Sequence, residues 1–176
     1  MWEMVTAVAT VGIAVIALLA IYFQNKSFQL TLAADLSMKL EEKFNDKEFR
    51  KLRAKAALSL KTHDEEGEAE EVFDFFDTIG LFTRRGALDE RFVHSMFFHW
   101  INLYWIAGRD HIRKRQKGAK CLWNEFEYLY ARVVELEKKQ DPNSKDIELS
   151  ANDLALYLDD EIALTQSTAR TSVDQQ

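Results

Sequence analysis

The sequence is most constrained by an uncharged apolar stretch near its N-terminus, which runs from Val5 to Phe23. Its length of about nineteen residues is that of a helix crossing the hydrocarbon core of a bilayer. A cleaved signal peptide is disfavoured, because the only early charge is the acidic Glu3 and the run ends in bulky residues instead of small ones. We therefore expect residues 1–24 to form a retained transmembrane anchor.

Basic residues are distributed asymmetrically about this stretch. None precedes it, whereas Lys26 follows it at once and more lysines and arginines follow within residues 39–55. Positively charged flanks stay on the cytoplasmic side of a membrane. We expect a single-pass protein of the cell's inner membrane, with its N-terminus outside and its C-terminal domain in the cytoplasm. The lone cysteine, Cys121, agrees with a reducing compartment.

The composition favours helices over strands. Gly (6) and Pro (1) are scarce, and Leu, Ala, Glu and Lys are good helix formers. About 150 residues follow the anchor, enough for one compact domain. We expect an all-α fold: a single N-terminal transmembrane helix (1–24), then a juxtamembrane helix (25–45), a small helical bundle (46–140) and an acidic, partly disordered tail (141–176). The net charge of −6 disfavours nucleic acid as a partner.

Short signals divide the chain into helices. An apolar stripe over residues 32–44 recurs at every fourth position, and Asp46 is placed to cap a new helix. Gly86 can adopt the positive φ that ends a helix, and Asp89 can cap the next one. Residues 84–89 therefore predict a tight turn between two helices.

Two later segments carry apolar stripes that can contact a partner. The first has a 4-3-4-3 spacing, which predicts a narrow seam as in packed bundles or coiled coils; it consists of Leu122, Phe126, Leu129, Val133 and Leu136. The second is a short amphipathic stretch around Leu154, Leu158 and Ile162, able to fold onto the bundle or onto a partner. Residues 165–176 lack apolar periodicity, and we expect them to be disordered.

Two pairs of residues are candidates for acid-base or metal chemistry. Asp74 and Asp77 lie three apart on one helix face, and paired carboxylates can do such work. The structural alternatives are a solvent-facing strip or a pairing with the nearby Arg84 and Arg85. His94 and His99 lie five apart, whereas joint metal ligation on a helix favours four. The structural interpretation is favoured for both pairs.

A basic segment, residues 109–120, stands out in an otherwise acidic chain. Its cations are candidates for contact with anionic lipid headgroups or with a phosphate-bearing partner, and they are Arg109, Arg113, Lys114, Arg115, Lys117 and Lys120. The alternative is a solvated helix end whose cations complement the C-terminal dipole.

Residues 71–105 carry a recognisable pattern, beginning EVFDFFDTIGLFTRRGALDERFV and continuing with FHWINLYW. It resembles a bacterial family of small membrane-anchored helical proteins catalogued as a domain of unknown function. The likeness extends from Val5 to Lys139 and rests mostly on core and turn positions. The resemblance therefore implies a fold, and it brings no activity with it.

These observations favour a non-enzymatic, membrane-tethered cytoplasmic helical module that binds a protein partner or forms a homo-oligomer. The alternative is an anionic-lipid or metal-dependent sensor, or an enzyme, that uses the region of Asp74, Asp77, His94 and His99. Motifs for phosphate binding, nucleophilic catalysis or zinc binding are absent from the sequence. We therefore assign no catalytic, cofactor-binding or metal-ligating residue and expect no cofactor.

Overall fold

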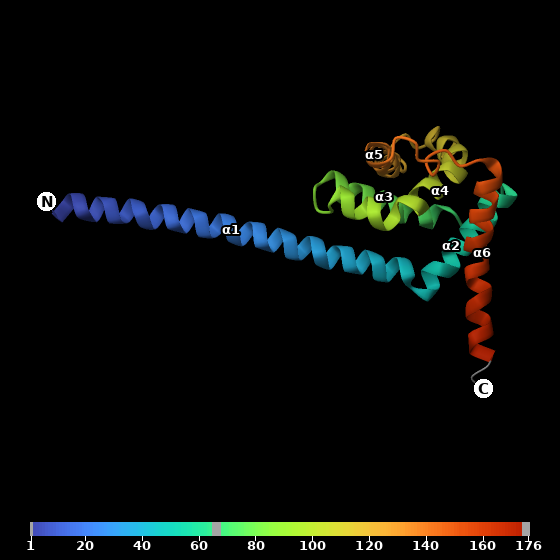
Figure 1. Cartoon of the computed structure of the whole chain (residues 1–176), viewed down its shortest axis with the longest axis horizontal. Helices are drawn as coiled ribbons and strands as arrows, with labels where there is room; N and C mark the ends of the chain where they lie inside the picture. The colour runs from blue at the N-terminus through green and yellow to red at the C-terminus, as the bar shows by residue number, and fades with distance from the viewer. Residues whose placement is uncertain (1, 65–67, 174–176) are drawn as a thin grey trace. The chain divides into compact units, whose positions relative to one another are not determined.

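The structure is a computed structural model that describes the backbone of residues 2–64 and 68–173, and their side chains apart from those of 2–18, 25, 28–30 and 164–173. The described residues contain helices and no strand, which confirms the all-α class. Figure 1 shows the elements in chain order: α1 (Trp2–Asn45), α2 (Lys47–Thr62), α3 (Glu70–Arg84), α4 (Glu90–Gln116), α5 (Asn124–Gln140) and α6 (Ala151–Val173).

The chain divides into two units, Met1–Met38 and Lys39–Gln176. The first is formed by most of α1, and the second contains the last turns of α1 together with α2 to α6. The residues of the predicted anchor and of the juxtamembrane helix that follows it belong to one continuous helix, α1. The sequence contains neither Gly nor Pro between Gln24 and Asn45, so nothing in it interrupts the helix there.

The predicted anchor falls mostly on residues 1–18, whose side chains lie outside the part that the structure describes. Its last residues, Leu19 to Phe23, are exposed. Within the described residues, no helix combines the length and the apolar character needed to cross a membrane. The anchor stays a prediction.

Side-chain caps begin two of the helices as the sequence predicts. The carboxylate of Asp46 accepts hydrogen bonds from the backbone N–H groups of Glu48 (2.9 Å) and Phe49 (3.2 Å) at the start of α2. These bonds, the one from Phe49 foremost, lower the pKa of Asp46. Asp89 accepts the equivalent bonds at the start of α4, and Gly86 takes a φ of 70° in the turn before it. The predicted turn over residues 84–89 is confirmed.

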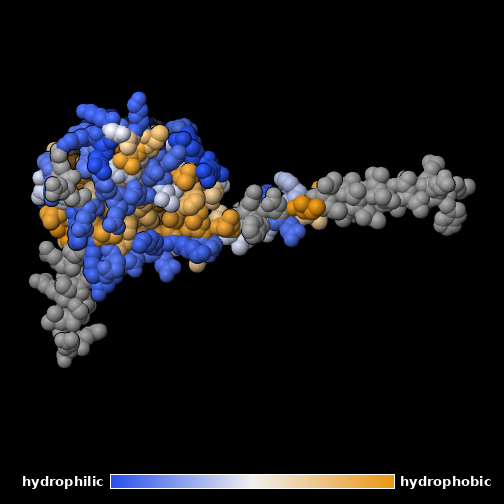
Figure 2. Space-filling model, turned by 180° about the vertical axis from the view of Figure 1, so that it is seen from behind, coloured by the Kyte–Doolittle hydropathy of each residue, from blue (hydrophilic) through white to orange (hydrophobic). Residues whose placement is uncertain are grey.

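Aromatic rings from α3, α4 and α5 form the centre of the bundle. Phe76 and Phe126 stack with ring centroids 5.3 Å apart, and Trp105 meets Phe126 edge to face at the same distance. All three side chains are buried. On the face shown in Figure 2, by contrast, the surface of the bundle is mostly hydrophilic, with hydrophobic side chains gathered in smaller patches. The apolar stripes of these helices are therefore largely used inside the chain.

The C-terminal segment contains α6, which continues to Val173, and residues 174–176 lie outside the described part. The partial disorder expected in residues 141–176 stays a prediction. Leu158 and Glu161 are buried, and Ser150 caps the helix by accepting from the N–H of Asp153. The apolar stripe of α6 packs mainly against α2, so the bundle extends beyond residue 140.

Candidate functional site

The two acidic candidates, Asp74 and Asp77, hold α3 to the segment that begins α5. Asp74 accepts a 2.7 Å hydrogen bond from the indole N–H of Trp123. Asp77 accepts from the backbone N–H groups of Glu125 (2.9 Å) and Phe126 (3.0 Å). Both carboxylates therefore have structural partners, which favours the structural interpretation of this pair.

Of the two structural alternatives for these carboxylates, the pairing with Arg84 and Arg85 does not occur among the described residues. Arg84 instead forms an ion pair with Glu125 at 2.9 Å, and its guanidinium lies 4.2 Å from the ring centroid of Tyr128. Arg85 is exposed. The acidic strip faces α5, and its hydrogen-bond donors come from there.

His94 and His99 lie in different surroundings on α4. The Nε2 atom of His94 is 2.9 Å from a carboxylate oxygen of Glu137 on α5. His99 is exposed and packs edge to face on Tyr157 of α6, with ring centroids 4.4 Å apart. The two imidazoles therefore face different helices and do not share a partner.

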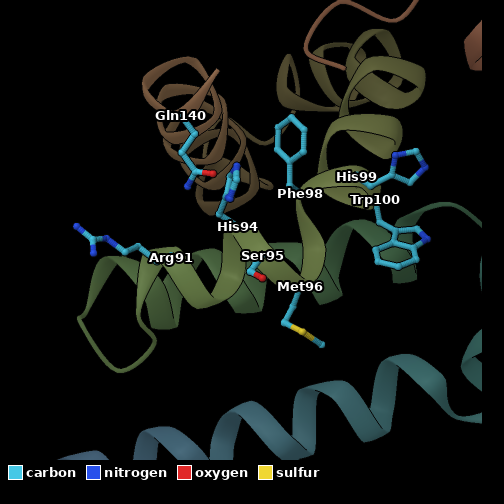
Figure 3. Close-up of a pocket in the computed structure, with 8 residues that line it drawn as sticks. All are labelled: Arg91, His94, Ser95, Met96, Phe98, His99, Trp100 and Gln140. Carbon is cyan, nitrogen blue, oxygen red and sulfur yellow. The ribbon is translucent and has the colours of Figure 1, made fainter. Parts of the chain in front are cut away.

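Both histidines line a surface hollow of about 480 Å³, drawn in Figure 3. Apart from Gln140, its lining comes from one stretch of α4, and comprises Arg91, His94, Ser95, Met96, Phe98, His99 and Trp100. Figure 3 shows these side chains leaving α4 in several directions, with Met96 pointing away from His94. The polar side chains that line the hollow therefore do not converge on a common point.

No metal centre forms among the residues that the structure describes, where no group of three or more His, Cys, Asp or Glu side chains is placed to hold an ion. The groups of the alternative hypothesis are dispersed over contacts with α5 and α6. Acid-base or metal chemistry needs such groups to converge in one pocket. The geometry of the described residues gives that alternative no site.

The predicted apolar seam of α5 is used inside the bundle. Phe126, Leu129 and Val133 are at most 1% exposed, and α5 packs against α3 and α4. Leu122 and Leu136, at the ends of the seam, are half-buried. The seam therefore lies against its own chain, and it cannot serve as a partner surface while the bundle is folded.

The basic segment lies at the C-terminal end of α4 and in the turn after it. Its cations are all exposed, and they differ in their partners. The Nε atom of Arg115 forms an ion pair with a carboxylate oxygen of Glu70 at 3.0 Å. The Nε atom of Arg109 lies farther, 4.0 Å, from the carboxylate of its neighbour Asp110. Among the described residues, no acidic group pairs with Arg113, Lys117 or Lys120.

A groove of about 350 Å³ borders this segment between α4 and the end of α2. Lys114 and Arg115 contribute to its lining together with Asp64 and Asp110, so its charge is mixed. The groove therefore favours neither an anion nor a cation. The candidate contact surface is the exposed end of the segment instead.

The most completely built polar site in the described bundle was not predicted from the sequence. Arg53 of α2 and Glu161 of α6 are 3% and 6% exposed, and they form two hydrogen bonds, of 2.8 Å from Nε and 2.6 Å from Nη2. The indole N–H of Trp100 donates to Glu161 at 3.0 Å. The hydroxyl of Tyr104 lies 3.0 Å from the other oxygen of the same carboxylate.

Burial raises the pKa of Tyr104 well above its usual value, and the negative charge of Glu161 adds to the effect. The phenol therefore stays protonated, and its O–H lies within hydrogen-bond distance of the carboxylate and of the backbone carbonyl of Arg53, which is 3.1 Å away. No periodicity connects Arg53 with Glu161, since they are 108 residues apart. The available signal was a charged residue on the inner face of an amphipathic helix, as at Arg53 among Ala54, Ala56 and Ala57.

A family model described as Domain of unknown function (DUF4760) matches residues 4–133. The chain therefore belongs to this family, and the match includes the α3–α4 turn and the basic segment. Comparisons with the curated proteins and with the solved structures gave no match.

Proposed function

We propose that the chain is a non-enzymatic helical module, tethered by Val5–Phe23 to the inner membrane of the cell with its bundle in the cytoplasm. In this proposal the basic segment is the contact surface, and its partners are the anionic headgroups of lipids. The hydrophobic tether holds the chain in the membrane, and the electrostatic attraction of the basic segment draws the bundle to the anionic surface.

The observation that supports the proposal is the set of exposed cations at the end of α4. Arg113, Lys117 and Lys120 have no acidic partner among the described residues, in a chain whose net charge is −6. A basic residue close to an anionic membrane surface contributes about 1 kcal/mol of attraction. An exposed cation with a free charge can supply that energy without first breaking an internal ion pair.

The other features that suggested a protein partner or a homo-oligomer are engaged within the chain. The α5 seam packs against α3 and α4, and the tail helix α6 packs against α2. An enzyme is disfavoured because Asp74, Asp77 and His94 each have a structural partner of their own. The basic segment is the surface that these internal contacts leave available.

A fluorescent label on Cys121 tests the proposal. This cysteine is the only one in the sequence, is exposed, and follows Lys120 directly. The full-length chain, carrying an environment-sensitive dye at this position, is placed in lipid nanodiscs made from phosphatidylcholine alone or from a mixture with phosphatidylglycerol. We expect a blue-shifted emission in the anionic nanodiscs, which is lost as salt screens the attraction.

A matched pair of variants shows which charges are responsible. Replacing Arg113, Lys117 and Lys120 by Gln should abolish the lipid-dependent shift. Replacing three exposed lysines elsewhere, Lys47, Lys138 and Lys145, removes the same charge and should preserve it. Identical emission in neutral and anionic nanodiscs, or an equal loss in both triple variants, would contradict the proposal.

A further inference from the structure

The described part of α6 is attached to the bundle by few buried side chains. Within residues 151–163, Leu158 and Glu161 are buried, whereas Leu154, Ala155, Tyr157 and Ile162 are half-buried. The ion pair between Lys61 and Asp159 is exposed, and such pairs contribute little to stability. The docking of α6 therefore depends heavily on the site that receives the Glu161 carboxylate.

This site is a receptor for a carboxylate, built by α2 and α4. Arg53 supplies two hydrogen bonds to Glu161, Trp100 supplies a third, and the Tyr104 hydroxyl lies within reach of a fourth. A buried ion pair of this kind adds little net stability, because desolvation offsets the attraction. The loss of either partner is costly, however, because it leaves a buried charge without compensation.

The same guanidinium also contacts the last turn of α1. The Nη1 atom of Arg53 donates to the backbone carbonyl of Phe44 at 3.3 Å, and the guanidinium carbon lies 3.9 Å from the centroid of the Phe44 ring. The ring of Phe44 in turn meets the indole of Trp100 edge to face at 4.9 Å. Arg53 and Trp100, which both donate hydrogen bonds to Glu161, therefore also contact Phe44 in the last turn of α1.

We infer that α6 is a reversibly docked helix, and that its docking is coupled through Arg53 to the joint between α1 and α2, residues 44–50. When Glu161 leaves, the buried guanidinium must be solvated, and the water that reaches it also reaches the Phe44 carbonyl. Elements with little buried surface open locally at a free-energy cost below that of global unfolding. The joint then opens together with α6 while α3, α4 and α5 stay packed. The inference rests on contacts separate from the basic segment.

Hydrogen exchange of the full-length chain in detergent micelles, followed by mass spectrometry, tests this coupling. Glu161→Gln keeps the shape of the side chain and removes its charge. Loss of a charge-assisted hydrogen bond should raise local exchange by about tenfold or more. We expect this rise in residues 151–163 and in residues 44–50 together. Asp159→Asn removes a charge from the exposed face of the same helix and should leave both segments unchanged.

A second variant serves if Glu161→Gln does not fold. Tyr104→Phe removes a single hydroxyl beside Glu161 and keeps the buried ring, so it should produce a smaller parallel rise in both segments. Faster exchange confined to α6, faster exchange across α3 to α5 as well, or no change in either variant would each overturn the inference.

Discussion

The carboxylate of Asp77, in the middle of α3, accepts a 2.9 Å hydrogen bond from the backbone N–H of Glu125 at the start of α5. The position that normally caps α5 is occupied by Trp123, which has a φ of 54° and makes no side-chain cap. Asp77 therefore supplies from a neighbouring helix the acceptor that α5 lacks in its own sequence.

Removing this cap should destabilise the bundle. Asp77→Ala leaves the first N–H groups of α5 without an acceptor, and we expect the free energy of unfolding to fall by about 1–2 kcal/mol. Denaturation of the full-length chain in micelles, followed by tryptophan fluorescence, measures the change. Asp110→Ala removes a carboxylate that is 91% exposed and should have little effect; equal losses in the two variants would refute the role of Asp77.

A methyl group at Gly80 should also be destabilising. A Cβ atom there would lie 2.1 Å from the carbonyl oxygen of Glu125, so α3 and α5 would have to separate. We expect Gly80→Ala to cost about 1–3 kcal/mol, as is typical of overpacking. Gly118→Ala is the control, because its Cβ would lie 3.7 Å from the nearest atom. A Gly80→Ala protein as stable as the wild type would contradict this close approach.

The raised pKa of Tyr104 predicts how stability depends on alkaline pH. The folded chain keeps this phenol protonated at pH values where the unfolded chain, with a pKa near the usual 10.0, has lost the proton. The contribution is therefore fully present below pH 10 and is lost as the pH rises through the folded pKa. Unfolding free energies measured from pH 8 to 11 should fall less steeply in Tyr104→Phe. Parallel curves would show that Tyr104 ionises equally in both states.

The ion pair between Arg53 and Glu161 should behave as a unit. Arg53→Met leaves a buried carboxylate without its cation, and we expect a loss of about 3–5 kcal/mol. Replacing both residues, Arg53→Met with Glu161→Leu, removes the uncompensated charge and should cost less than the single change. Chemical denaturation of both variants measures the difference. A double variant less stable than Arg53→Met would contradict a buried pair of this kind.

Local features of the fold could be predicted where one short stretch contains all of the interacting groups. The caps at Asp46 and Asp89 and the positive φ of Gly86 depend on residues within a few positions, and the structure confirms them. The helical class follows from composition and periodicity for the same reason. The α3–α4 turn was placed correctly because its signals are adjacent in sequence.

Features that join distant residues could not be predicted in the same way. The apolar seam of α5 has the spacing of a partner surface, and periodicity does not distinguish a partner from the protein's own α3 and α4. The acidic composition of the last segment gave no sign of its contact with α2. Glu161 is buried against Arg53, which is distant in sequence. The basic segment keeps the exposure that its sequence suggested.

The accessibility of Cys121 to a membrane-impermeant thiol reagent tests the tethered orientation most directly. The residue is exposed on the bundle, so its labelling reports the side of the membrane on which the bundle lies. In intact spheroplasts that produce the full-length chain, we predict a membrane-bound protein that is labelled only after the membrane is permeabilised. Labelling of intact spheroplasts, or recovery of the chain in the soluble fraction, would contradict the account.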